Sequence, residues 1–129
     1  MSQRRFSLLA WMMVVAVMAV GIAASTAQAQ TIDEAKAVVL ENPEDPARHY
    51  NLGVVYYKNG KFSDAIASFQ EAVSLKEDYK EAFYNMGLAQ QKMNQHNAAI
   101  KSLKSATDID KGYADAFAVL GNSYRKKGQ

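Results

Sequence analysis

Cysteine is absent from this chain of 129 residues. The domain therefore has no disulfide bridge, no thiol nucleophile and no cysteine ligand for a metal ion. There is also no cysteine to carry a lipid, which excludes a lipoprotein. The fold must be stabilised by side-chain packing alone.

Histidine is almost as scarce, and the two copies are His49 and His96. We expect His49 to fill a packing position and His96 to lie in a turn between helices, far from the i, i+4 spacing of a helical metal site. Asp108 and Asp110 are expected to be turn residues. No glycine-rich phosphate loop, nucleophile elbow or isolated carboxylate pair is present. The sequence thus predicts a protein that is not an enzyme and that binds no metal or cofactor.

Charged residues are missing from a long stretch near the N-terminus. Arg4 and Arg5 are followed by an uncharged, mostly apolar run over residues 8–24, and the small-residue pattern Ala27-Gln28-Ala29 closes it. This is typical of a secretory signal peptide cleaved after Ala29. The alternative is an uncleaved signal anchor, since the run is barely long enough to span a bilayer. Both predict export to the periplasm or cell envelope, with a membrane contact only if the segment stays uncleaved.

Net charge is also missing from the remainder. Removing Arg4 and Arg5 from the fifteen basic residues leaves thirteen, which equals the thirteen acidic ones. A formally neutral domain offers no electrostatic argument for nucleic acid as a partner.

What the chain does contain is a repeat of thirty-four residues. Residues 46–79 align without a gap with residues 80–113, and a third copy opens at residue 114. The positions that match best are Leu52-Gly53 with Met86-Gly87, Ala65-Ile66 with Ala99-Ile100, Phe69 with Leu103, Ala72 with Ala106, and Tyr79 with Tyr113. Repeats of this length indicate a stack of identical structural units.

Each unit is predicted to be a helical hairpin. Its apolar residues fall at helical spacing in two runs, which Asn59-Gly60 separates, and Asp45-Pro46 supplies a cap and a first-turn proline. A glycine within a helix needs a compensating close approach. We expect Ala65 and Ala72 of the second helix to meet Gly53, and Ala99 and Ala106 to meet Gly87.

The period, the L-G-x-x-Y pattern, the A-I-x-x-F pattern and the later alanine resemble the tetratricopeptide repeat. The resemblance covers residues 46–128 and implies an all-α, right-handed solenoid of helical hairpins. It departs at His49, at Asn94 in place of the turn glycine, and at Glu77 and Lys111 in place of proline. The predicted organisation is a signal peptide or anchor (1–29), an orphan N-terminal helix (30–45), two repeats (46–79 and 80–113) and a C-terminal half repeat (114–129).

The resemblance also implies a concave groove that binds a protein or peptide. Carried over by position, its lining comprises Tyr50, Asn51, Val54, Tyr57, Lys58, Glu81, Tyr84, Asn85, Leu88, Gln91, Lys92, Asp115, Asn122, Arg125 and Lys126. Tyrosines supply contact area and amides can pair with a peptide backbone. The basic clamp by which some family members hold a C-terminal carboxylate is largely missing, because Tyr50, Val54 and Asp115 occupy its positions. An exported adaptor is therefore our first hypothesis.

The half repeat at the C-terminus raises an alternative. Leu120, Gly121 and Tyr124 are the residues that receive a second helix in the other units, yet no second helix follows in the sequence. They are either a tolerated apolar strip or an assembly surface. In the latter case the missing helix comes from a partner protein, or from residues 31–43 of another copy, which would make the protein a self-assembling scaffold and a homo-oligomer.

Overall fold

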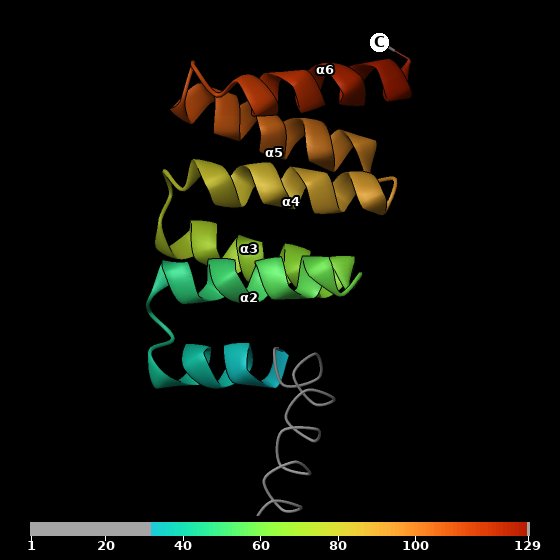
Figure 1. The fold of residues 1–129 in the computed structure, drawn as a ribbon. Helices are drawn as coiled ribbons and strands as arrows, with labels where there is room; N and C mark the ends of the chain where they lie inside the picture. The colour runs from blue at the N-terminus through green and yellow to red at the C-terminus, as the bar shows by residue number, and fades with distance from the viewer. Residues whose placement is uncertain (1–31, 129) are drawn as a thin grey trace, which may run out of the picture. The chain divides into compact units, whose positions relative to one another are not determined.

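Helices account for the regular secondary structure throughout the described part of the chain. The structure is a computed structural model that describes residues 32–128. Residues 32–41 are helical, and five helices follow: α2 (Pro46–Lys58), α3 (Phe62–Leu75), α4 (Lys80–Lys92), α5 (His96–Ile109) and α6 (Ala114–Lys127) (Figure 1). The signal segment predicted for residues 1–29 lies outside the described residues.

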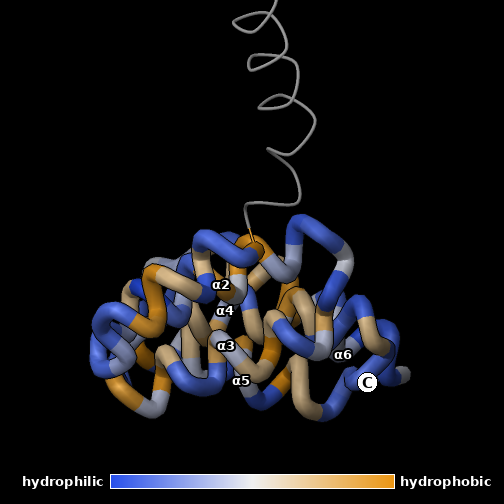
Figure 2. The backbone as a smooth tube through the Cα atoms, turned by 90° about the horizontal axis from the view of Figure 1, so that it is seen from below, coloured by the Kyte–Doolittle hydropathy of each residue, from blue (hydrophilic) through white to orange (hydrophobic). Residues whose placement is uncertain are grey.

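The helices form two layers. Each packs against the next one along the chain, and α4 also contacts α2 and α6. Figure 1 shows α2, α4 and α6 at the front with α3 and α5 behind them, and Figure 2 shows the amphipathic alternation of hydrophobic and hydrophilic stretches along the helices. The prediction of an all-α solenoid of helical hairpins is confirmed.

The helices α2, α4 and α6 are each followed by a residue in the same backbone conformation. Gly60, Asn94 and Gly128 follow these helices with φ angles of 73°, 59° and 85°, in the left-handed region that closes a helix. Asparagine tolerates this conformation better than most side chains, so Asn94 takes the place of the turn glycine without loss of the turn. At the start of α2, the Asp45 carboxylate accepts a hydrogen bond from the Ala47 amide at 2.9 Å, as the predicted cap requires.

The helical glycines receive large side chains. An ideal Cβ at Gly53 would lie 2.6 Å from Cε1 of Phe69, and one at Gly87 would lie 2.7 Å from Cγ of Leu103. Both side chains are fully buried. The expectation that alanines of the second helix make this approach is therefore wrong. Phe69 and Leu103 lie on the same helix face as those alanines, and their length carries them into the space that the missing Cβ leaves.

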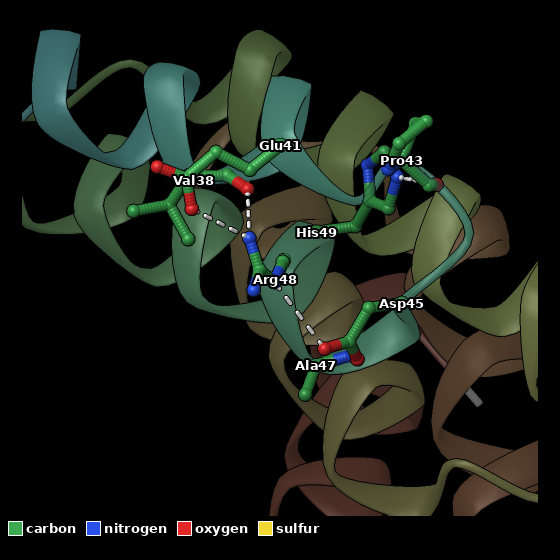
Figure 3. Close-up of polar contacts among 7 residues, drawn as sticks. All are labelled: Val38, Glu41, Pro43, Asp45, Ala47, Arg48 and His49. Carbon is green, nitrogen blue, oxygen red and sulfur yellow. Dashed lines mark hydrogen bonds and ion pairs between the residues drawn. The ribbon is translucent and has the colours of Figure 1, made fainter.

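Arg48 ties the helical segment 32–41 to α2. Its guanidinium donates to the Val38 carbonyl and to Glu41 at 3.1 Å, and it also pairs with Asp45 at 3.4 Å (Figure 3). His49 makes a hydrogen bond of 2.7 Å to the Pro43 carbonyl, so it holds the turn instead of filling a purely apolar position. The segment thus ends two residues before the proline that shapes the connection.

His96 differs from its prediction. It is the first residue of α5, not a turn residue, and its Nδ1 atom is buried without a hydrogen-bond partner. The turn that precedes it has a single residue in the left-handed region, Asn94, as the turn before α3 has Gly60. Asp110 does lie just beyond its helix, whereas Asp108 belongs to the last turn of α5.

Candidate functional site

The first helices of the repeats, α2, α4 and α6, carry the residues predicted to line the groove. We call this set the A-helix face: Tyr50, Asn51, Val54, Tyr57, Lys58, Tyr84, Asn85, Leu88, Gln91, Lys92 and Asn122. The three helices run in the same direction and α4 contacts both of the others (Figure 1). The structure therefore brings the predicted residues onto adjacent helices.

Tyr50 is the best-held side chain of the A-helix face. Asn85 of α4 donates a hydrogen bond to its hydroxyl oxygen at 2.9 Å, across the boundary between the repeats. The Tyr50 ring also lies 5.1 Å from that of Tyr79 and 5.8 Å from that of Phe69, between centroids. Such tilted aromatic pairs stabilise a fixed ring orientation. The Tyr50 side chain is thus held in one orientation.

The same aromatic pair recurs one repeat later. The rings of Tyr84 and Tyr113 lie 5.1 Å apart, as do those of Tyr50 and Tyr79. Tyr79 and Tyr113 were not among the predicted site residues, although their recurrence at the period of the repeat was visible in the sequence. They stand immediately before α4 and α6, and their rings support the tyrosines of the face.

These tyrosines keep their protons well into the alkaline range. Burial raises the pKa of Tyr50, Tyr79 and Tyr84, and it raises the pKa of Tyr113 to about 12. The hydrogen bond from Asn85 opposes the shift at Tyr50, while the Glu81 charge adds to it there. Each phenol is therefore a neutral donor at neutral pH.

Other members of the face take part in packing. The Gln91 amide donates to the Ser123 hydroxyl and to the Val119 carbonyl, which joins α4 to α6. Asn122 accepts a hydrogen bond of 2.9 Å from Arg125. By contrast, the side chains of Asn51, Lys58 and Lys92 are exposed. The exposed members are the ones available to a ligand without any change in the fold.

An ion pair that the sequence did not predict lies at the edge of this face. Lys80 at the start of α4 and Asp110 just after α5 are 2.6 Å apart, and the Lys80 ammonium also stands 5.5 Å from the Tyr113 ring centroid. The hydrogen bond from Lys80 lowers the pKa of Asp110, and the same bond raises the pKa of Lys80. This pair joins the turns of successive repeats.

The predicted terminal assembly surface lies on α6, and within residues 32–128 the neighbouring helices cover only one side of α6. Ala116 and Ser123 are fully buried, and Ser123 accepts a hydrogen bond from Gln91 of α4. On the other side Phe117 is 45% exposed, Gly121 is exposed, and Leu120 and Tyr124 are half-buried. The corresponding Leu52 and Met86 of the earlier repeats are 8% and 4% exposed. A face that is core in two repeats is therefore surface in the third.

Two family models match the chain, one described as TPR repeat over residues 55–94 and one described as tetratricopeptide repeat over residues 80–113. Together with the stack of thirty-four-residue hairpins, they decide the classification. The chain belongs to the tetratricopeptide-repeat family. A search of curated protein sequences returns no significant match.

Solved tetratricopeptide-repeat structures resemble the chain closely. Two crystal structures of MamA share 28% and 27% identity with it, at TM-scores of 0.73 and 0.75, over 75% and 78% of this chain. The chain spans only 57% and 55% of those MamA chains. The first such domain of Spaghetti (RPAP3), bound to the HSP90 peptide SRMEEVD, is 19% identical at a TM-score of 0.76, over 81% of this chain and 83% of that one.

Neither a metal centre nor a membrane span emerges from the described residues of this repeat protein. No group of three or more histidine, aspartate or glutamate side chains within residues 32–128 is placed to hold a metal ion. Within the same range, every helix is too short or too polar to cross a bilayer.

Proposed function

We propose that this tetratricopeptide-repeat protein is an adaptor that binds an extended peptide, or a segment of a partner subunit, on its A-helix face. The observation that carries the proposal is the pair Tyr50 and Tyr84, which lie one repeat apart and pack against Tyr79 and Tyr113, beside exposed amide and lysine side chains. Rigid aromatic groups give contact area at little entropic cost, and amides can pair with a peptide backbone. The chain contributes binding and no chemistry of its own.

The peptide complexes of RPAP3 support this proposal at the level of the fold. That domain holds an HSP90 peptide ending in EEVD, and the second domain of human RPAP3 holds an HSP70 peptide with the same ending. We expect a different ligand here. Tyr50, Val54 and Asp115 stand where a basic clamp would be, so this face offers little to a doubly charged C-terminus.

Export forms the second part of the proposal. Residues 1–29 have the sequence features of a signal peptide or anchor, and these features support a location in the periplasm or at the cell envelope. The partner is then an envelope protein or a segment of one.

Selection from a library of random peptides tests the binding site. The full chain would be used as bait, and the affinity of selected peptides would be measured by fluorescence anisotropy. We expect Asn51→Ala and Tyr57→Ala each to weaken binding at least about tenfold, the range of an interface hot spot. Asn51 is exposed, so its replacement changes the ligand site and not the core.

The matched control is Gln70→Ala, because Gln70 is exposed on α3 in the other layer. It should leave every affinity unchanged. Peptides that bind equally well to the Asn51 and Tyr57 variants would place the site elsewhere and refute the proposal, as would a selection that yields no binding peptide.

A further inference from the structure

The second repeat departs from the other two at one position of its first helix. Tyr56 of α2 and Tyr124 of α6 occupy the place that Gln90 takes in α4, one repeat length away on either side. The Tyr56 ring packs against the core that α3 and α4 form. Glutamine has no ring, so the second repeat lacks the aromatic group that the first and third carry at this position.

A pocket of about 320 Å³ lies beside Gln90, between α3 and α5. We call it the α3–α5 pocket, and its volume is at the lower end of the range of ligand sites, about 300–1,000 Å³. Its lining consists of Phe83, Met86, Ala98, Gln70, Gln90, Ser102, Ser105 and Lys101. The lining residues of α4 lie on the side of the helix opposite to Tyr84 and Leu88 of the A-helix face. The pocket is therefore separate from that face.

Gln90 brings an amide donor into the pocket. Its side chain is only 8% exposed, and its Oε1 atom accepts a hydrogen bond of 2.8 Å from the Ser102 hydroxyl. This is the one hydrogen bond that the Gln90 side chain makes with residues 32–128, so its Nε2 amide has no partner there, although that atom is not fully enclosed. An amide so close to burial favours a ligand that carries a hydrogen-bond acceptor.

Two hydroxyl groups supply acceptors in the same pocket. The Ser102 hydroxyl donates its proton to Gln90, and the Ser105 hydroxyl donates to the Lys101 carbonyl at 3.2 Å. Both oxygen atoms keep lone pairs that accept a further hydrogen bond. A phenol both donates and accepts, and its ring pairs favourably with an aromatic ring such as Phe83 and with a thioether such as Met86. The lining thus matches the side chain of tyrosine.

Charge indicates what stands next to that ring. Among the residues that line the α3–α5 pocket, Lys101 alone is charged, and its side chain is exposed. An exposed ammonium group favours an acidic group close by and disfavours a basic one. An acidic residue adjacent to the tyrosine is therefore complementary to this pocket.

We propose that the α3–α5 pocket binds the phenol ring of a tyrosine that a partner protein presents next to an acidic residue. The ring lies against Phe83 and Met86, and its hydroxyl accepts from Nε2 of Gln90 and donates to the oxygen of Ser102 or Ser105. The partner thus supplies to the second repeat the aromatic group that the first and third repeats carry themselves. The proposal does not depend on peptide binding by the A-helix face.

A set of capped dipeptides tests the chemistry of the pocket. N-acetyl-Glu-Tyr amide would be titrated into the full chain, and the NMR signals of the Gln90 side-chain amide and the Met86 methyl group would be followed. We expect saturable shifts of both signals. N-acetyl-Glu-Phe amide lacks the hydroxyl and should bind about three- to tenfold more weakly, the range of one hydrogen bond. N-acetyl-Lys-Tyr amide should also bind more weakly, because its ammonium group is repelled by Lys101.

Two variants at Gln90 locate the binding. Gln90→Tyr fills the pocket with a ring of the chain itself, as the sequence does at positions 56 and 124, and should abolish the shift at Met86. Gln90→Met removes the amide and keeps a flexible side chain, so it should weaken the tyrosine dipeptide about three- to tenfold and leave the affinity for the phenylalanine dipeptide unchanged. A general disturbance of packing would affect both dipeptides equally.

Circular dichroism would check that both variants keep their helical content. The control on the other surface is Tyr57→Ala, which should leave the affinity for the tyrosine dipeptide unchanged. Peptides selected on the A-helix face should in turn keep their affinity for Gln90→Tyr, as for Gln70→Ala. Failure of one site is therefore distinguishable from failure of the other.

Four results would overturn the proposal. The first is a tyrosine dipeptide that produces no saturable shift, the second is equal affinity for the tyrosine and phenylalanine dipeptides, and the third is undiminished binding to Gln90→Tyr. The fourth is free p-cresol that binds as tightly as N-acetyl-Glu-Tyr amide. The acidic neighbour and the peptide would then contribute nothing, and the occupant would be a free phenol instead of a partner protein.

Discussion

Alanine replacement of the three helical glycines should separate the filled sites from the empty one. A Cβ at Gly53 would lie 2.6 Å from the Phe69 ring, whereas carbon atoms normally touch at about 3.5–4 Å, so the ring must move by about 1 Å. Overpacking of this kind costs about 1–3 kcal/mol, while alanine gains about 1 kcal/mol of helix propensity over glycine. Gly53→Ala should therefore lower the free energy of unfolding by up to about 2 kcal/mol.

At Gly121 only the gain in helix propensity applies, because no atom lies within 4 Å of the position of the new methyl group. Gly121→Ala should raise the free energy of unfolding by up to about 1 kcal/mol, which corresponds to a rise of roughly 4–8 °C in Tm for a domain of this size. Gly87→Ala should behave like Gly53→Ala, since Cγ of the buried Leu103 lies 2.7 Å from its Cβ position.

Urea unfolding followed by far-ultraviolet circular dichroism measures all three variants. A double-mutant cycle gives the internal control: in a Phe69→Ala background the obstacle is gone, so Gly53→Ala should become stabilising. Equal stabilisation by Gly53→Ala and Gly121→Ala in the parent chain would refute the reasoning, because it would mean that Phe69 does not occupy the space at Gly53.

Three further predictions concern polar groups. The Tyr113 phenol has a pKa of about 12 in the fold against 10.0 when unperturbed. Its contribution to the free energy of unfolding is therefore complete below pH 10 and is lost as pH rises from 10 to 12. In urea titrations at several pH values, Tyr113→Phe should reduce this loss of stability at alkaline pH. The hydrogen bond from Lys80 lowers the pKa of Asp110. The contribution of Asp110 to the free energy of unfolding is therefore present above the ordinary carboxyl pKa range and is lost as pH falls through the lowered pKa. Asp110→Asn should reduce the loss of stability at acid pH in the same titration. The Ser102 hydroxyl donates to the buried Gln90 oxygen at 2.8 Å, so Ser102→Ala should lower the free energy of unfolding by about 1–3 kcal/mol in urea titration.

The Asp110 and Ser102 predictions each have a matched control in the same chain. Asp108 forms an exposed ion pair with Lys111, and exposed pairs contribute little to stability, so Asp108→Asn should be nearly neutral beside Asp110→Asn. Ser63 is exposed on α3, and Ser63→Ala should be nearly neutral beside Ser102→Ala. The assigned partners would be contradicted if the loss of stability at acid pH were the same in the two aspartate variants. They would also be contradicted if Tyr113→Phe left the loss of stability at alkaline pH unchanged.

The repeat itself was readable from the sequence because its signals are local. The period, the cap at Asp45 and the left-handed turn at Gly60 each depend on residues within a few positions of one another, and the structure confirms them. The role of Asn94 in place of glycine could also be predicted from the sequence, since asparagine is one of the few residues that adopts the left-handed backbone conformation.

Contacts across long separations were not readable. Lys80 and Asp110 stand thirty positions apart in different helical units, and nothing local marks them as partners. The alanines were expected to meet the glycines because small residues suggest close backbones, but the side chain that fills such a space is decided by three-dimensional reach. The assignment of the A-helix face to ligand binding stays a prediction, because its tyrosines also serve the packing between repeats.

Among the described residues, α6 contacts α4 and α5, whereas α4 contacts helices on both of its sides. In a stacked array, stability is close to a sum of terms between nearest neighbours, so a helix with fewer neighbours opens more readily. The amides of α6 should therefore exchange with solvent faster than those of α4 in the chain of residues 1–129. Hydrogen exchange would thus read the number of neighbours of each helix as a gradient of protection along the stack.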